Sequence, residues 1–213
     1  MSDQRLRELE RRWRETGSVE DEAAYLRERV RVGDLTQERL ELAAHCGHEG
    51  ARRALGQEPI APPRSPSETT SWLRSLPQAP HEVLVRAALQ AARNGVAAGD
   101  NHAKRGRFRE RVIEAKRAVS AVEKWLACPC LRHEEPLTEF MYFGESQPGV
   151  RESADLAGAI TAVVLFKSTD AEQVLGPFVE HQDSWWRMCR TNAPNLIGQT
   201  LAFVIGGAAL ERR

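Results

Sequence analysis

Three side chains with metal-binding chemistry lie close together in the sequence: Cys128, Cys130 and His133, in the pattern C-x-C-x-x-H. Thiolate sulfur and imidazole nitrogen are preferred zinc ligands, and a structural zinc site holds four ligands of this kind. A complete site normally shows two ligand pairs in the sequence, whereas this segment supplies one. The pattern leaves two interpretations open: a zinc site completed from elsewhere in the chain, or free thiols that fill space at the end of a helix.

A second group with the same chemistry, His45, Cys46 and His48, lies between two expected helices. These side chains could complete the first group if the fold brings the two segments within reach. Gly47 and the small alanines before it fit the corner of a helical hairpin instead. We expect the hairpin corner, with His48 stabilising the turn by a hydrogen bond.

No pattern in the sequence predicts a catalytic centre. There is no G-x-S-x-G turn and no glycine-rich phosphate-binding loop. Cys189 and His181 would lie about two turns apart on one helix, too far for a hydrogen bond. All four cysteines are expected to be reduced thiols, and the proline between Cys128 and Cys130 places that pair poorly for a disulfide within one turn. We therefore expect no enzyme activity and, in the main interpretation, no cofactor.

The composition is that of a globular protein. The chain has 213 residues, of which 41% are hydrophobic, enough for a buried core. Its 30 basic and 30 acidic residues give a net charge of zero, so nucleic-acid binding would need a local basic patch. The first residues are charged, and the longest uncharged runs are too short or too interrupted to span a bilayer. We expect a cytoplasmic protein with no membrane partner.

Apolar residues at helical spacing predict four short helices in residues 1–56. The glycines expected to end them are Gly17, Gly33, Gly47 and Gly56. Ser18 should cap the second helix, and either Asp34 or Thr36 the third. These features predict an N-terminal helical-hairpin module without strands.

Prolines separate this module from the rest of the chain. Residues 57–69 begin with QEPIAPPRSP, which contains four prolines and predicts a linker. Residues 70–213 are expected to form a larger helical domain. A short helix is predicted from Trp72 to Leu76, where Pro77 stops it. The other predicted helices cover residues 81–94, 104–127, 153–166, 171–188 and the segment from Pro194 onward, with a loop or short hairpin over 136–149. The predicted fold class is all-α, with little or no sheet.

Three glycines in the last predicted helix indicate close packing against a neighbouring element. They are Gly198, Gly206 and Gly207. Because glycine has no Cβ atom, another backbone can approach a helix closely at these positions.

The pattern L-x-L-A-A-x-x-G-H comprises Leu40, Leu42, Ala43, Ala44, Gly47 and His48. It resembles the central line of an ankyrin repeat, and the resemblance covers residues 36–56. What the resemblance implies is a pair of antiparallel helices that meet at small alanines, with a Gly-His corner between them.

A second resemblance is carried by RAALQAARNGVAAG and RVIEAKRAVSAVEKWLACP. An alanine-rich helix is followed by a helix that ends in Trp-Leu-Ala, and in this pattern the segments resemble small helical proteins of high-GC bacteria, including immunity proteins of polymorphic toxin systems. The resemblance implies a protein that acts by binding another protein.

Charge is unevenly distributed along the second half of the chain. Residues 104–132 carry nine Lys or Arg against three Glu, whereas residues 133–183 carry two basic residues against ten acidic ones. The two stretches could face each other in one fold or lie on separate solvated surfaces. A third interpretation is that the basic stretch is an interaction face.

Basic and aromatic side chains are the candidates for contact with a partner protein, because interfaces favour Trp and Arg. Adjacent tryptophans on a helix point to different faces, so that one of them can be exposed. The candidate contact residues are Arg107, Arg111, Lys116, Trp185 and Trp186.

We therefore predict a non-enzymatic intracellular protein-binding module, acting through helical surfaces as an inhibitor, an immunity protein or an adaptor. The alternative is a metal-stabilised or metal-dependent protein that uses Cys128, Cys130 and His133. A weaker alternative is nucleic-acid binding through the basic helix over residues 104–124, which should weaken steeply with added salt.

Overall fold

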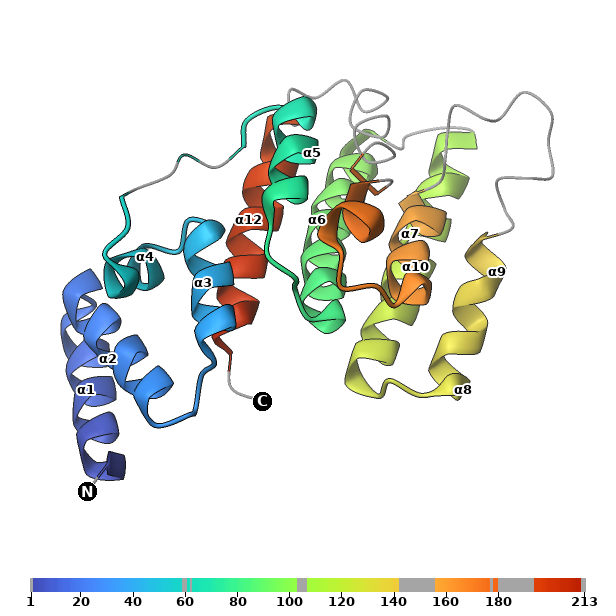
Figure 1. The fold of residues 1–213 in the computed structure, drawn as a ribbon. Helices are drawn as coiled ribbons and strands as arrows, with labels where there is room; N and C mark the ends of the chain where they lie inside the picture. Colours follow the sequence, from blue (N-terminus) through green and yellow to red (C-terminus); the bar gives the residue numbers. More distant parts are fainter. Residues whose placement is uncertain are drawn as a thin grey trace. The chain divides into compact units, whose positions relative to one another are not determined.

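The computed structural model describes residues 2–58, 61, 63–102, 107–141, 156–176, 178–179 and 194–211. Over these ranges the secondary structure is helical and contains no strand, which confirms the predicted all-α fold (Figure 1). The chain divides into two compact units. The first comprises Met1–Pro62 and Ala202–Arg213, and the second comprises Pro63–Leu201.

The first unit is built from short helices that pair along the chain. They are α1 (Ser2–Thr16), α2 (Val19–Arg31), α3 (Gln37–His45), α4 (Glu49–Leu55) and the end of α12 (Pro194–Leu210). Helix α2 packs against both α1 and α4, and α4 packs against α3 (Figure 1). The helical-hairpin character expected for the N-terminal region is therefore present.

Glycines end the N-terminal helices as predicted. Gly17, Gly33, Gly47 and Gly56 all have positive φ, between 61° and 83°. Glycine adopts this left-handed conformation without the steric penalty that a Cβ atom imposes. The predicted caps are also present, because Ser18 accepts a hydrogen bond from the backbone N–H of Asp21, and Thr36 accepts one from Arg39. Thr36 is thus the cap of α3, one of the two candidates.

The core of the first unit is apolar and closely packed. Leu26, Leu40 and Leu42 are buried, each at 2% exposure or less. Burying a leucine side chain contributes about 1.5–3 kcal/mol to folding. Trp13 of α1 stacks on Tyr25 of α2, with ring centroids 5.3 Å apart, which joins the first two helices.

The end of α12 belongs to this unit, although the sequence placed it in the C-terminal domain. A Cβ atom built on Gly206 would lie 3.1 Å from the Cβ atom of Cys46, so the glycine permits the close approach predicted there. Gly198, in the part of α12 assigned to the second unit, similarly faces Thr69 and Pro63. The prediction is wrong for Gly207, which is exposed and has no neighbour within 4 Å of a built Cβ.

Two arginines bind the carbonyl groups at the end of α12. Arg39 donates from Nε to the carbonyl oxygen of Ala209 at 2.6 Å, and from Nη2 to those of Ala208 and Glu211, both at 3.0 Å. Arg29 donates to the carbonyl oxygen of Leu210 at 2.6 Å. The last carbonyl groups of a helix have no partner within the helix, and positive charge is favourable at this end. The arginines meet both needs.

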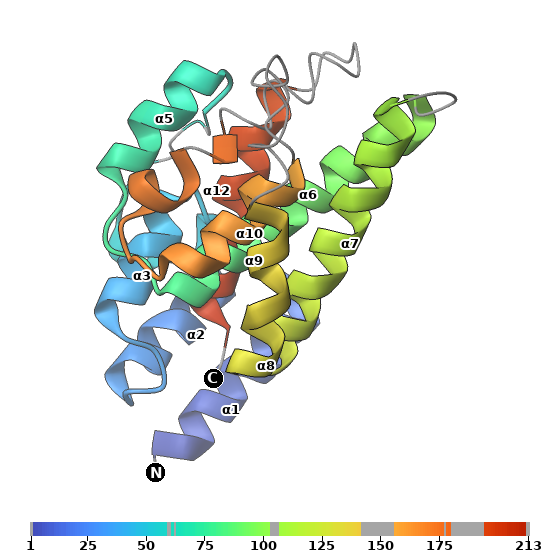
Figure 2. The same cartoon turned by 90° about the vertical axis from the view of Figure 1, so that its right-hand side faces the viewer.

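The second unit contains longer helices. They are α5 (Pro66–Ser75), α6 (His81–His102), α7 (Arg107–Ala127), α8 (Leu131–Glu134), a 3₁₀ turn (Glu135–Leu137), α9 (Thr138–Met141) and α10 (Leu156–Phe166). Residues 171–176 and 178–179 are also helical. Helix α10 packs on α6, α7 and α9, and α6 packs on α7 (Figure 2).

Several predicted boundaries in the second unit change. Helix α5 begins at Pro66, inside the predicted linker, because Ser65 caps it and proline is tolerated in the first turn. Helix α6 continues to His102 and does not end near Asn94. The helix passes through Gly95, which is buried, so packing outweighs the poor helix propensity of glycine there. The predicted loop over 136–149 begins instead with helical turns as far as Met141.

His81, the first residue of α6, ties this helix to the end of α10. Its Nε2 lies 3.0 Å from the carbonyl oxygen of Val164, and its Nδ1 lies 3.2 Å from that of Ser168. Carbonyl oxygens only accept hydrogen bonds, so the imidazole N–H is the donor in this bridge. The ring also meets Trp125 edge to face, at 6.1 Å between centroids.

Among the helices described, none combines the length and apolar character that crossing a bilayer requires.

Candidate metal and thiol site

The three residues Cys128, Cys130 and His133 meet at the corner between α7 and α8. The N–H of Cys128 still bonds the carbonyl oxygen of Lys124, at 3.1 Å, as in the last turn of α7. The N–H of Cys130 then bonds the carbonyl oxygen of Cys128 at 2.8 Å, a hydrogen bond across three residues that defines a γ-turn. Pro129 occupies its centre, where the fixed φ of proline is suitable.

This turn brings the side chains of the corner together. The sulfur atoms of Cys128 and Cys130 lie 3.3 Å apart, and the sulfur of Cys130 lies 3.4 Å from Nδ1 of His133. One ligand atom from each residue lies within 4.8 Å of the others. Within the ranges that the structure describes, no other group of three histidine, cysteine or acidic side chains is arranged in this way.

The distances are close to those of a bound zinc ion. With tetrahedral angles and the usual bond lengths, two sulfurs on zinc lie about 3.8 Å apart, and a sulfur and a nitrogen about 3.5 Å apart. The sulfur-to-nitrogen distance in the corner already fits. The two sulfurs would need to separate by about 0.5 Å to accept the ion.

Hydrogen bonds make the two thiols unequal. Cys128 donates its S–H to the sulfur of Cys130, which lowers the pKa of Cys130, and the backbone N–H groups of His133 and Arg132 act in the same direction. The same hydrogen bond, together with the charge on Cys130, raises the pKa of Cys128. The corner therefore favours one thiolate, on Cys130, and resists a second unless a cation lies between the sulfurs.

The His133 ring is also held in place. Its Nδ1 lies 3.0 Å from the carbonyl oxygen of Cys128, so that Nδ1 carries the proton and donates it. A metal ion on Nδ1 would take the place of this proton, and Nε2 would then carry the proton. The corner can thus supply two thiolates and one imidazole nitrogen, leaving a fourth position open.

The corner lies at the surface. Cys128 is exposed and Cys130 is partly exposed. Leu131, the first residue of α8, is 79% exposed. Glu134, one residue after the ligand group, is engaged in an ion pair with Lys167, with 2.7 Å between the charged atoms. The ligand group is therefore accessible from solvent.

The second cysteine and histidine group, in the first unit, serves the hairpin corner. Nδ1 of His48 accepts a hydrogen bond from the N–H of Ala51 at 3.3 Å, which caps α4 and confirms the predicted role. Cys46 is buried, and burial raises the pKa of its thiol far above the usual range. Burial, and then the charge of Arg52, lowers the pKa of His45. These side chains are engaged in the fold of their own unit.

The candidate contact residues are only partly described. Lys116 forms an ion pair with Asp100 of α6, with 2.6 Å between the charged atoms. Arg111 is half-buried, and Arg107 is the first residue of α7. Trp185 and Trp186 lie outside the described residues.

Part of the basic charge on α7 is neutralised within the second unit. Besides the Lys116 pair, Arg117 binds Glu114 of the same helix at 2.8 Å. These pairs weaken the field that nucleic-acid binding through this helix would need. The weaker alternative stays an untested prediction.

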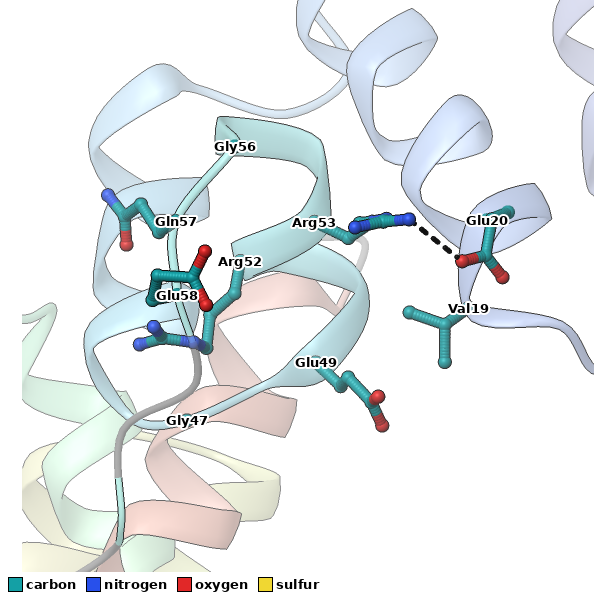
Figure 3. A pocket seen from close by; sticks show the side chains of 9 residues that line it. All are labelled: Val19, Glu20, Gly47, Glu49, Arg52, Arg53, Gly56, Gln57 and Glu58. Atoms are coloured by element: carbon teal, nitrogen blue, oxygen red, sulfur yellow. Dashed lines mark ion pairs between the residues drawn. The ribbon is translucent and has the colours of Figure 1, made fainter.

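A pocket in the first unit was not predicted from the sequence. It has a volume of about 490 Å³ and lies between α2, α4 and the turn at Gly47 (Figure 3). Arg52 lies at its inner side, 5% exposed, and donates to the carbonyl oxygen of Ala44 at 3.4 Å. On the outer side Arg53 pairs with Glu20 across 3.3 Å. Its mixed charges could bind polar groups, but its lining contains no cysteine, histidine or serine.

The γ-turn explains why sequence spacing alone missed the proximity of the two sulfurs. Two side chains separated by one residue point to different sides of a helix. The sequence predicts Cys128 and Cys130 at the end of the long helix, where their sulfur atoms would not meet. The signal that could have found the turn is the proline between the cysteines, because proline ends the helix and favours this backbone conformation.

Comparison with family models, with curated proteins and with solved structures gives no match for this chain.

Proposed function

We propose that this protein binds a zinc ion at the α7–α8 corner through Cys128, Cys130 and His133. The observation that carries the proposal is the convergence of their three ligand atoms within 4.8 Å. Soft thiolate ligands select zinc over magnesium or calcium, which prefer oxygen. With three protein ligands, the fourth position would hold water or a group from another molecule.

The ion would connect the end of α7 with the start of α8. Its charge would stabilise both thiolates, which the metal-free corner resists. Because binding requires the folded corner, zinc should raise the stability of the second unit by mass action. At a free zinc concentration 100 times the dissociation constant, the gain is about 2.7 kcal/mol.

Metal titration of the purified, reduced protein tests the proposal. We expect one equivalent of zinc to bind, and cobalt to give the intense absorption of a thiolate-to-metal bond. Cys130→Ser and His133→Ala should each weaken binding at least about tenfold, because each removes a ligand. Cys46→Ala is the matched control, since it removes a buried thiol from the first unit and should leave binding unchanged. Equal zinc affinity in wild type and Cys130→Ser would show that the corner is not the site.

A second candidate function is the one expected from the sequence, the binding of another protein by an inhibitor, immunity protein or adaptor in the cytoplasm. Phe203 of α12 favours it, because its side chain is 83% exposed. Aromatic side chains are common anchors in interfaces. A tagged protein should retain a stoichiometric partner that Phe203→Asp loses while its helical circular dichroism is unchanged. A partner held equally well by both proteins would argue against this surface.

A further inference from the structure

We propose that Cys128 and Cys130 form a reversible disulfide that switches off the zinc site. The inference rests on the proposed function, because the switch acts on the same ligands. In this role the γ-turn holds the two thiols close enough to be oxidised, which metal binding alone does not require.

The distance between the two sulfur atoms is intermediate between that of a disulfide bond and that of two sulfurs bound to one zinc ion. The sulfurs are 3.3 Å apart, whereas a disulfide bond is about 2.05 Å long and two zinc-bound sulfurs are about 3.8 Å apart. Closing the bond needs an approach of about 1.3 Å, and zinc binding needs a separation of about 0.5 Å. Both are within the reach of side-chain rotation about a fixed turn.

The backbone holds the pair ready for either state. The hydrogen bond from the N–H of Cys130 to the carbonyl oxygen of Cys128 is 2.8 Å long, and Pro129 restricts the backbone between them. The two residues therefore do not lose much chain entropy when the bond forms. Cys46, by contrast, is a buried thiol of the first unit.

An exposed thiol 3.3 Å from a second sulfur is accessible to small disulfides such as glutathione disulfide, the oxidant that we name for this step. The Cys130 thiol gives up its proton to water, and its sulfur attacks one sulfur of glutathione disulfide, which breaks the S–S bond and releases one glutathione. The Cys128 thiol then gives up its proton to water and attacks the sulfur of Cys130, forming the intrachain bond and releasing the second glutathione. The two cysteines lose two electrons and two protons in total, and glutathione disulfide gains them.

Oxidation and zinc binding should exclude each other. A disulfide removes two of the three protein ligands, because metal binding requires thiolates. We expect the oxidised protein to bind zinc at least about 100-fold more weakly than the reduced protein. Zinc should in turn slow oxidation at least about tenfold, since the bound thiolates are no longer free to attack.

The experiment uses the full chain, reduced and metal-free or loaded with zinc, in glutathione redox buffers. Trypsin should release residues 125–132 as one peptide, which contains both cysteines between Lys124 and Arg132. Its mass reports directly whether two hydrogens have been lost or glutathione has been added. Zinc titrations before oxidation, after oxidation and after reduction by dithiothreitol complete the measurement. Cys46→Ala should behave as wild type, and Cys128→Ser should stop at a glutathione adduct.

The outcomes separate the switch from the zinc site. Loss of two hydrogens in this peptide, with reversible loss of zinc binding, supports the switch. Normal zinc binding with only free thiols or glutathione adducts in the oxidising buffer overturns the switch and leaves the zinc site intact. If the disulfide forms but the reduced and the oxidised protein bind zinc equally well, the switch is overturned. If neither form binds zinc, both the switch and the proposed zinc site are overturned.

Discussion

Replacement of Arg39 by Met should destabilise the first unit by releasing the end of α12. Methionine keeps much of the apolar stem and removes the guanidinium that donates to three carbonyl oxygens, at 2.6, 3.0 and 3.0 Å. A net hydrogen bond contributes about 0.5–1.5 kcal/mol, so three give a range of about 1.5–4.5 kcal/mol. One of the three is at an exposed site and two share a nitrogen, so we expect about 2–3 kcal/mol.

Urea denaturation gives the change in the free energy of unfolding, and amide hydrogen exchange shows where the change occurs. We expect faster exchange in residues 202–211 than in the wild type. Arg11→Met is the control, because Arg11 is an exposed helical arginine paired only with nearby glutamates. A loss of less than about 1 kcal/mol in R39M, with unchanged exchange over α12, would show that the arginine does not hold this helix.

Three further changes test other parts of the fold. His81→Ala should lose about 1–3 kcal/mol in urea denaturation, because it removes the ring that bridges the carbonyl oxygens of Val164 and Ser168, and an unchanged midpoint would contradict the bridge. Gly206→Val should cost about 1–3 kcal/mol through its clash with Cys46, whereas Gly207→Ala should add about 0.5–1 kcal/mol in the same assay, and equal effects would refute the packing. Burial, opposed by the charge of His48 and reinforced by that of Glu49, raises the pKa of Glu22, so the folded state binds a proton more readily than the unfolded chain. Stability from this group should therefore rise as the pH falls from neutrality through the folded pKa, and Glu22→Gln should abolish that rise in denaturation measured across pH.

The helices of the N-terminal region could be predicted closely because their ends are encoded locally. A glycine that adopts positive φ and a side-chain cap act within a few residues, as at Gly17 and Ser18. The prediction for α6 was wrong because local propensity does not include burial. Gly95 would end a solvent-exposed helix more readily than it ends one that is packed on two neighbours.

The candidate site could be predicted in its residues but not in its geometry. The spacing of Cys128, Cys130 and His133 identified the ligand types, yet the distance between the sulfurs depends on a γ-turn that spacing does not specify. The roles of Arg29 and Arg39 were missed for a different reason. Their acceptors lie 181 and 170 residues later in the chain, and nothing in the local sequence identifies them.

The placement of the last turns of α12 has a consequence for synthesis of the chain. The first unit consists of residues made before the second unit and of residues made after it. Its early helices therefore emerge from the ribosome without the segment that covers Cys46 and receives the two arginines. Closing so long a loop is slow, because its entropy is lost before the contacts form. The second unit can fold as it emerges, whereas the first is completed only after residues 202–211 have been made and can receive the two arginines.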